Sequence, residues 1–217
     1  MRVSGKLFPD GLAGLIFDCD GVMIDSEEAN RFFYDSVLSW LGFPPMTKEQ
    51  EDYAFMATAQ DALKRMLPKE LHARIPEAIA NGVDYQSDVL KRVKLMPGFE
   101  AFIKEAHGRG LRMAIDSNRT SEGIQRVLDF FALPLYFDPV ISSSIAAPKP
   151  SPEGARLICE SWGAAPSQAL FVGDSENDRL AALSAGVPFA AFGAGSGMKC
   201  AVSAPNYDSL AKSLWGA

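Results

Sequence analysis

The fold is decided by the stretch LAGLIFDCDGV, residues 12–22. Residues 12–17 form a short apolar run, which ends abruptly at two carboxylates, Asp18 and Asp20, followed by Gly21. An unbroken apolar run closed by glycine is typical of a strand buried on both faces of a parallel sheet. Residues two apart at a strand end point the same way, so both carboxylates are expected over one spot, about 6–7 Å apart. Because two acids placed together repel each other, the stretch predicts a cation.

The composition of the 217 residues is that of an ordinary globular protein, 47% hydrophobic and 22% charged. It leaves room for one large domain or a domain with an insert. The net charge of −6 argues against nucleic acid as a partner, and charge or glycine interrupts every apolar run, which argues against a membrane span. Cys19, Cys159 and Cys200 form an odd, sparse set that indicates reduced thiols and a cytoplasmic location. We expect a monomer or a weak homodimer.

Between about residues 29 and 95 the sequence predicts one helix after another. Asp25 followed three residues later by Glu28 resembles a capping box, which would open a helix that runs to about Leu41. An α/β sheet does not normally wait so long for its second strand, so we expect an inserted all-helical unit. The predicted division is an α/β core of residues 1–27 and 96–217 with a helical cap domain of residues 28–95.

After residue 96 the pattern changes to short strands that alternate with helices. Strands are predicted at residues 111–115, 139–141, 169–172 and 188–192, with a closing helix at 207–214. Such alternation is typical of right-handed βαβ units and a parallel sheet with helices on both faces. The predicted fold class is therefore α/β, a Rossmann-like parallel sheet core with an inserted all-helical cap domain.

The polar residues of chemical interest each follow a predicted strand. They are Asp18 and Asp20, then Ser117 and Asn118, then Lys149, and finally Asp174 and Asp178. In a parallel sheet these strand ends lie along one edge, which is where ligands bind in open α/β sheets. Acids, a hydroxyl and an ammonium around one point suit phosphoryl transfer. They offer a carboxylate nucleophile, ligands for a hard cation and donors for the phosphate oxygens.

Four segments resemble, in order, the motifs of the haloacid dehalogenase (HAD) superfamily. Residues 18–22 are similar to the first motif, Ser117 at a strand end to the second, Lys149 to the third, and residues 173–178 to the fourth. The resemblance covers roughly residues 12–192. The helical insert falls between the first two motifs, where the phosphoglycolate phosphatase-like and β-phosphoglucomutase-like branch carries its cap.

The resemblance implies catalytic and metal-binding roles for the acids. Asp18 would attack phosphorus and become an aspartyl phosphate. Asp20 would protonate the leaving oxygen and then take a proton from the water that hydrolyses the intermediate. Asp18, the backbone carbonyl of Asp20, and Asp174 would hold Mg²⁺. Asp178 would orient metal-bound water from outside the ligand set.

The resemblance also implies which residues receive the phosphate. Ser117 and the neighbouring backbone amides would bind phosphate oxygens, and Lys149 would offset the crowded negative charge. Asn118 is expected to bind substrate beside them. This agrees with elementary electrostatics, because an unscreened carboxylate should not approach a phosphate dianion.

Structural alternatives stay open for several positions. Ser117 could cap the next helix, Lys149 could be a solvated surface lysine, and Asp178 could be only an acid in the first turn of a helix. Arg119 could either touch the substrate or lie on the surface. Cys19 is expected to point away from the two acids and to serve packing.

The implied activity is that of a Mg²⁺-dependent phosphoric monoester hydrolase for a small phosphorylated metabolite. One alternative is a β-phosphoglucomutase-like sugar phosphomutase, although residues 53–61 lack the glycine-containing loop that many sugar-phosphate members carry in the cap. A phosphonate hydrolase would need a cap lysine for imine formation. From another class, a non-catalytic or phospho-accepting binding protein remains, although receiver domains carry the accepting Asp on a later strand and lack a large helical insert.

Overall fold

The computed structural model describes residues 7–193 and 198–216. The chain divides into two compact units, one made of Met1–Ile24 and Leu95–Ala217, the other of Asp25–Lys94. Each unit is described by itself.

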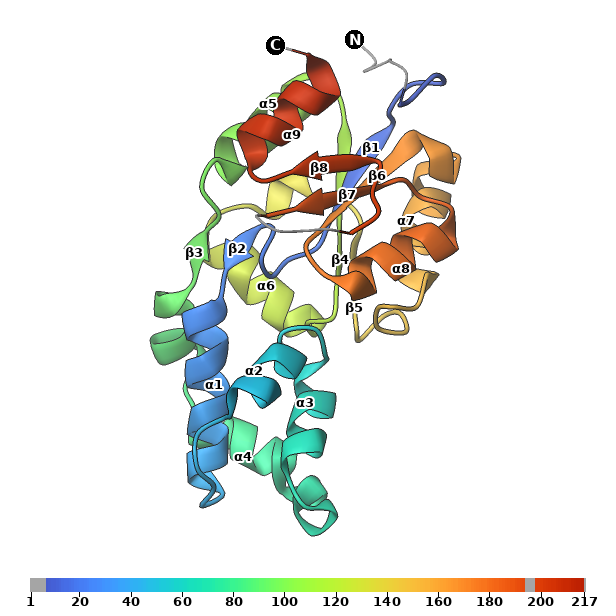
Figure 1. Ribbon diagram of the computed structural model, residues 1–217. Helices are drawn as coiled ribbons and strands as arrows, with labels where there is room; N and C mark the ends of the chain where they lie inside the picture. Colours follow the sequence, from blue (N-terminus) through green and yellow to red (C-terminus); the bar gives the residue numbers. More distant parts are fainter. Residues whose placement is uncertain (1–6, 194–197, 217) are drawn as a thin grey trace. The chain divides into compact units, whose positions relative to one another are not determined.

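The first unit is built on a six-stranded sheet in which every neighbouring pair is parallel (Figure 1). In spatial order its strands are β5 (Val140–Ser142), β4 (Arg112–Ser117), β1 (Gly14–Phe17), β6 (Ala169–Gly173), β7 (Phe189–Phe192) and β8 (Val202–Ala204). The chain builds outward from β1 to one side and then returns to build the other side. The reversal makes the carboxyl end of β1 a topological switch point, where open α/β sheets bind ligands.

Helices cover both faces of this sheet. Alternate residues such as Ile16 and Phe171 face a buried cluster with α7 (Glu153–Trp162) and α8 (Glu176–Ala185). Helices α5 (Phe99–Gly108) and α9 (Tyr207–Trp215) contribute aromatic side chains to the opposite face. Helix α6 (Ser121–Phe130) and two short 3-10 helices, η4 (Pro134–Tyr136) and η5 (Pro166–Gln168), complete the connections. The predicted α/β class is confirmed.

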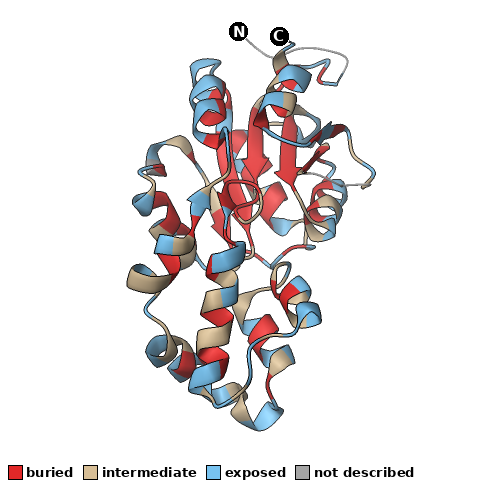
Figure 2. Ribbon diagram, turned by 60° about the vertical axis from the view of Figure 1, so that its left-hand side comes forward, coloured by how far each residue is buried: buried red, intermediate tan, exposed pale blue. Residues whose placement is uncertain are grey.

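The central strand is buried on both faces, as its unbroken apolar run predicts (Figure 2). On one face Phe17 meets the rings of Phe99 and Phe102 edge-on, with ring centroids 5.9 and 6.2 Å apart. Each such pair contributes about 0.5–1.5 kcal/mol beyond its buried area. The strand end that carries the first two acids is therefore held in a rigid core.

The second unit is helical. Its main elements are α1 (Glu27–Trp40), α2 (Lys48–Ala54), α3 (Ala59–Met66) and α4 (Ile75–Gly82), with the short helices η1 (Lys69–Arg74), η2 (Tyr85–Val89) and η3 (Leu90–Arg92). At its boundaries the chain forms two short strands, β2 (Ile24–Asp25) and β3 (Lys94–Leu95), which pair with each other. Its observed limits lie close to the limits predicted for the cap domain. That it works as a cap is a proposal.

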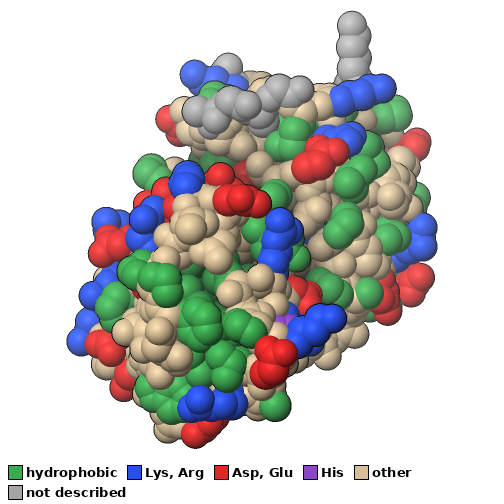
Figure 3. Space-filling view, turned by 60° about the horizontal axis from the view of Figure 1, so that its bottom comes forward, with side chains coloured by type: hydrophobic (Ala, Val, Ile, Leu, Met, Phe, Trp, Pro, Cys, Tyr) green, Lys and Arg blue, Asp and Glu red, His purple; other side chains and the backbone are tan. Residues whose placement is uncertain are grey.

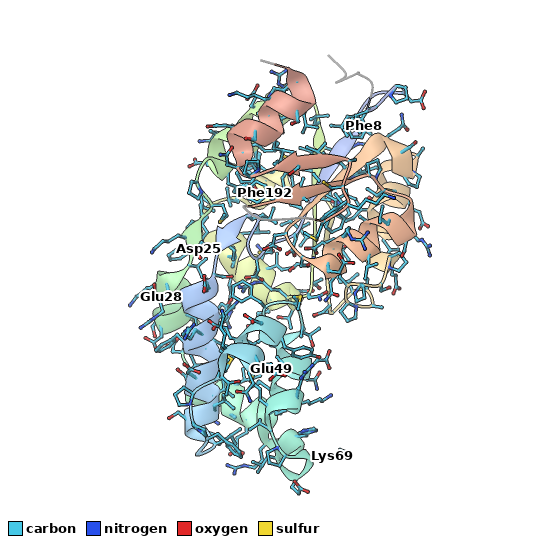
Figure 4. The ribbon with its side chains drawn as sticks, viewed as in Figure 1. Phe8, Asp25, Glu28, Glu49, Lys69 and Phe192 are labelled. Atoms are coloured by element: carbon cyan, nitrogen blue, oxygen red, sulfur yellow. The ribbon has the colours of Figure 1, made fainter. Side chains whose placement is uncertain are left out.

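The predicted capping box at the start of α1 is wrong. Ser26 is the N-cap residue and makes no side-chain cap hydrogen bond, while Asp25 Oδ1 accepts only a long bond of 3.4 Å from the Glu27 amide. Figure 4 labels Asp25 and Glu28 beside the start of α1. The carboxylate of Glu28 instead lies 3.8 Å from Arg92 Nε. An ion pair with a residue distant in sequence has replaced the local cap.

The surface carries both signs of charge. Acidic and basic side chains lie next to one another across the face shown in Figure 3. Among the described residues, no helix has the length and apolar character that crossing a bilayer requires.

Candidate active site

The predicted site residues of the first unit lie at the carboxyl ends of strands or on the segments that follow them. Asp18 follows β1, and its amide still donates to the carbonyl of Val172 on β6, at 3.0 Å. Ser117 ends β4 and Asp174 follows β6. The β1 strand end is thus tied directly to the strand that precedes Asp174.

Lys149 stands at the centre of the acids. Its Nζ donates to Oδ1 of Asp18 and to Oδ1 of Asp178, at 2.6 Å in each case. Its side chain is only 4% exposed, so the alternative of a solvated surface lysine is wrong. Burial alone lowers the pKa of Lys149, but the carboxylates of Asp178 and Asp18 outweigh it and raise that pKa above its usual value. The ammonium therefore stays charged.

Asn118 holds Lys149 in place. The backbone amide of Lys149 donates to Asn118 Oδ1 at 2.7 Å, and Asn118 Nδ2 donates to the carbonyl of Lys149 at 3.1 Å. This two-way clamp joins the end of β4 to the loop after β5. The clamp gives Asn118 a positioning role that the sequence did not indicate. Its predicted contact with substrate stays a prediction.

Three carboxylates form a compact cluster. One oxygen each from Asp18, Asp174 and Asp178 lie within 4.8 Å of one another. Two glycines make this approach possible. A Cβ built on Gly21 would lie 1.9 Å from Asp174 Oδ2, and one built on Gly173 would lie 2.4 Å from the Cβ of Asp178. Each motif thus needs its glycine beside the acids.

The cluster holds more negative charge than one ammonium offsets. Burial is the main cause that raises the pKa of Asp174 to about 7, and Asp178 adds to the rise. Burial also raises the pKa of Asp18 well above its usual value, although Lys149 acts in the opposite direction. Buried carboxylates with raised pKa values release their protons when a cation joins them.

The donor set fits a hard divalent cation. Carboxylate oxygens are the ligands that Mg²⁺ and Ca²⁺ prefer, and the three acids converge within the span that one ion can bridge. Asp20 is not among the three, which is compatible with the expectation that it offers a cation only its backbone carbonyl.

Asp178 is part of a helix cap and also contacts Lys149 in the site. It lies in the first turn of α8, where its Oδ2 accepts bonds from the amide and hydroxyl of Ser175, at 3.0 and 2.6 Å. The hydroxyl of Ser175 in turn accepts from the amide of Asp178 at 3.2 Å. This capping box leaves Oδ1 directed at Lys149. The cap therefore orients the acid toward the site.

Ser117 is buried at the end of β4 and does not cap α6. Thr120 is the N-cap residue, and its hydroxyl accepts from the amide of Gly123 at 3.2 Å. The hydroxyl of Ser117 accepts from the amide of Arg119, also at 3.2 Å. The phosphate-binding role of Ser117 stays a prediction.

Arg119 is the site residue that sequence reasoning left undecided. Its guanidinium forms a two-bond pair with the carboxylate of Asp20, and both distances are 2.7 Å. The surface alternative for Arg119 is therefore wrong. Its position two residues after Ser117, at the same strand end, was the available signal. Cys19, between the two acids, is fully buried, and burial raises the pKa of its thiol, which keeps it unreactive.

The chain resembles known proteins over most of its length. A sequence model of the family described as haloacid dehalogenase-like hydrolase matches residues 15–192, which contain all four motif segments. The chain belongs to the haloacid dehalogenase-like hydrolase family. The predicted resemblance is confirmed.

Curated relatives of this haloacid dehalogenase-like hydrolase carry one activity in their names. This chain is 31% identical over 215 residues to phosphoglycolate phosphatase 1 of Pseudomonas aeruginosa, with 94% of this chain and 79% of the relative covered. It is also 31% identical to a phosphoglycolate phosphatase of Vibrio vulnificus, with 92% of this chain and 93% of the relative covered.

Solved structures agree in fold. A crystal structure of a HAD-superfamily hydrolase, subfamily IA, variant 1, from Geobacter sulfurreducens superposes with a TM-score of 0.75 at 31% identity. The match covers 94% of this chain and 96% of the other. These likenesses support the phosphoglycolate phosphatase-like branch and phosphoric monoester hydrolysis, as predicted.

Proposed function

We propose that the protein is a Mg²⁺-dependent phosphatase that hydrolyses a small phosphomonoester through an aspartyl phosphate on Asp18. The observation that carries the proposal is the contact of Lys149 Nζ with Asp18 Oδ1, at 2.6 Å, beside two further carboxylates. A carboxylate held by a buried ammonium at a strand end is an oriented nucleophile. The names of the relatives make 2-phosphoglycolate the first substrate to test.

The first half of the reaction transfers the phosphoryl group to Asp18. A carboxylate oxygen of Asp18 forms a bond to phosphorus as the bond from phosphorus to the leaving oxygen breaks. Asp20 donates its proton to that leaving oxygen, which departs as an alcohol.

The second half regenerates the nucleophile. Asp20, now ionised, takes a proton from a water molecule that attacks phosphorus. The bond from phosphorus to Asp18 breaks, and inorganic phosphate leaves. Asp18 and Asp20 end in the protonation states in which they began.

The remaining residues make the approach of anions possible. Lys149 and the hydroxyl of Ser117 are proposed to donate to phosphate oxygens, which lowers the repulsion between Asp18 and the substrate. Asp18, Asp174 and the carbonyl of Asp20 would hold Mg²⁺, which when bound supplies a hard positive charge that joins the carboxylates to the phosphate. Asn118 keeps Lys149 in position beside the nucleophile, Asp18.

Residues 28–95 are proposed to act as the cap domain, and the protein to work as a monomer or weak homodimer in the cytoplasm. The location is supported by the thiols, since Cys19, Cys159 and Cys200 are all free.

The decisive experiment measures release of inorganic phosphate from p-nitrophenyl phosphate and 2-phosphoglycolate with Mg²⁺ present. Asp18→Asn should abolish release while circular dichroism shows an intact fold. Asp10→Asn, which changes an exposed acid in the turn before β1, is the matched control and should keep the wild-type rate. Wild-type turnover by Asp18→Asn would overturn the nucleophile assignment. In a separate assay with a sugar phosphate as substrate, isomerised product without free phosphate would favour a mutase.

A further inference from the structure

Arg119 and Asp20 form a charged pair that the proposed reaction must open. The Nε and Nη2 atoms of Arg119 donate to Oδ2 and Oδ1 of Asp20, so each carboxylate oxygen accepts a hydrogen bond from the guanidinium. Such two-bond pairs are strong and specific in geometry. The two side chains are 12% and 17% exposed, so the pair is largely shielded from water without being sealed from a ligand.

The backbone of Arg119 is fixed beside the predicted phosphate site. Its amide donates to the hydroxyl of Ser117, and its carbonyl accepts from the amide and the hydroxyl of Ser143, at 3.0 and 3.1 Å. The next residue, Thr120, caps α6. The backbone of Arg119 is therefore anchored at the same strand end as Ser117. This limits the positions that the guanidinium can reach around the predicted phosphate site.

This ion pair is incompatible with the proposed role of Asp20 as the proton donor to the leaving oxygen. To reach the leaving oxygen, Asp20 must turn at least one carboxyl oxygen away from Arg119. The guanidinium would then lose at least one of its two bonds to Asp20 while it stays largely shielded from water, which is costly. An anion that takes the place of Asp20 removes this cost.

We propose that Arg119 binds a second anionic group of the substrate, such as a carboxylate or a further phosphate, and so releases Asp20 toward the leaving oxygen. The inference rests on the proposed phosphatase function and narrows its substrate class to phosphomonoesters with a second negative charge near the ester oxygen. The exchange breaks no covalent bond, because Arg119 trades one anion for another. The released carboxylate of Asp20 takes up a proton from water before it donates to the leaving oxygen. The movement of Asp20 thus couples binding of the second anion to protonation of the leaving oxygen.

The test compares each acid substrate with its neutral amide. The two pairs are 2-phosphoglycolate with its primary amide and 3-phosphoglycerate with its primary amide, measured as kcat/KM. The wild type should prefer at least one acid to its amide. Arg119→Gln should lower kcat/KM for that acid by roughly 10- to 100-fold, the value of hydrogen bonds to a charged group. It should not lower kcat/KM for the amide, because Asp20 is then no longer held by the guanidinium.

Two further variants sharpen the comparison. Arg119→Lys keeps the charge but loses the fork, and should retain part of the preference for the acid. Arg126→Gln changes an arginine on α6 that pairs with Glu122, and should behave as the wild type on every substrate.

The contrary results are distinct. An equal loss on acid and amide in Arg119→Gln, or equal use of both by the wild type in both pairs, would overturn the inference. If p-nitrophenyl phosphate is still hydrolysed in an Asp18-dependent way, the phosphatase function survives that outcome. Absence of all phosphate release from the wild type would overturn the function and the inference together. Circular dichroism checks that Arg119→Gln is folded, and Arg119→Lys supplies the same contrast if it is not.

Discussion

Lys149 Nζ lies 2.6 Å from Oδ1 of Asp18, although the two residues are 131 positions apart in the sequence. The same ammonium contacts Asp178 at 2.6 Å. One cation thus holds the proposed nucleophile against an acid from α8. Because the three side chains are nearly buried, each depends on the others for charge balance.

Replacement of Lys149 by methionine should cost both stability and activity. The change leaves Asp18 and Asp178 buried without their cation, and breaking such an arrangement costs about 3–5 kcal/mol in unfolding free energy. Activity should fall by roughly 100- to 1,000-fold, as when a donor to transition-state charge is lost. Urea denaturation and phosphate release measure the two effects. Lys104→Met, which changes an exposed lysine paired with Glu100, should alter neither appreciably.

Gly21→Ala should displace acids of the cluster. This effect comes in addition to the stability that any non-glycine residue loses at this backbone conformation. Gly21 has φ +73°, and a Cβ there would lie 1.9 Å from Asp174 Oδ2. Gly110 has φ +78°, and a Cβ built there would meet nothing within 4 Å, so Gly110→Ala is a matched control. Both variants should lose about 1–2 kcal/mol of stability from the left-handed backbone.

Only Gly21→Ala should lose phosphatase activity, because only there must an acid of the site move. Phosphate release after purification of both variants tests this. Comparable activity in the two would show that the position of Asp174 is not needed.

Asp116 should make the protein less stable as the pH rises from about 4 to 6. Burial raises the pKa of its carboxyl from 3.8 to about 6. Its Oδ2 has no hydrogen-bond partner among the described residues. The folded state therefore binds the proton more tightly than the unfolded state, and the stability that this supplies below pH 4 is lost as the pH passes through 6.

Asp116→Asn should remove this loss. Above pH 6 the variant should gain on the order of 3 kcal/mol over the wild type at most, because each unit of pKa shift corresponds to about 1.4 kcal/mol. Unfolding free energies of both proteins from pH 4 to 8 measure the difference, with Asp10→Asn as the exposed control. A constant difference across that range would contradict the assignment.

The sequence predicted the sheet and the strand-end acids because both depend on local patterns. The apolar run before Asp18 and the run before Ser117 give β1 and β4 at their expected places. Strand β8 (Val202–Ala204) was missed, since three small or β-branched residues at a sheet edge give too short a pattern.

Contacts between side chains distant in sequence could not be predicted from the sequence either. The pair between Arg119 and Asp20 joins residues 99 positions apart, and no local pattern predicts which acid an arginine selects. The same holds for Glu28, which contacts Arg92 instead of closing a capping box. The positions of charged residues were predictable, but their pairings required the fold.

The most direct test of the central claim traps the phosphoryl group on the protein. With p-nitrophenyl phosphate, whose leaving group departs without an acid, Asp20→Asn should still accept phosphate but hydrolyse the intermediate slowly. Acid quenching followed by peptide mass mapping should then find one phosphoryl group on the peptide that contains Asp18. The double variant Asp18→Asn, Asp20→Asn should carry none. Phosphate on another residue, or turnover by Asp20→Asn at the wild-type rate with no phosphoenzyme, would contradict the account.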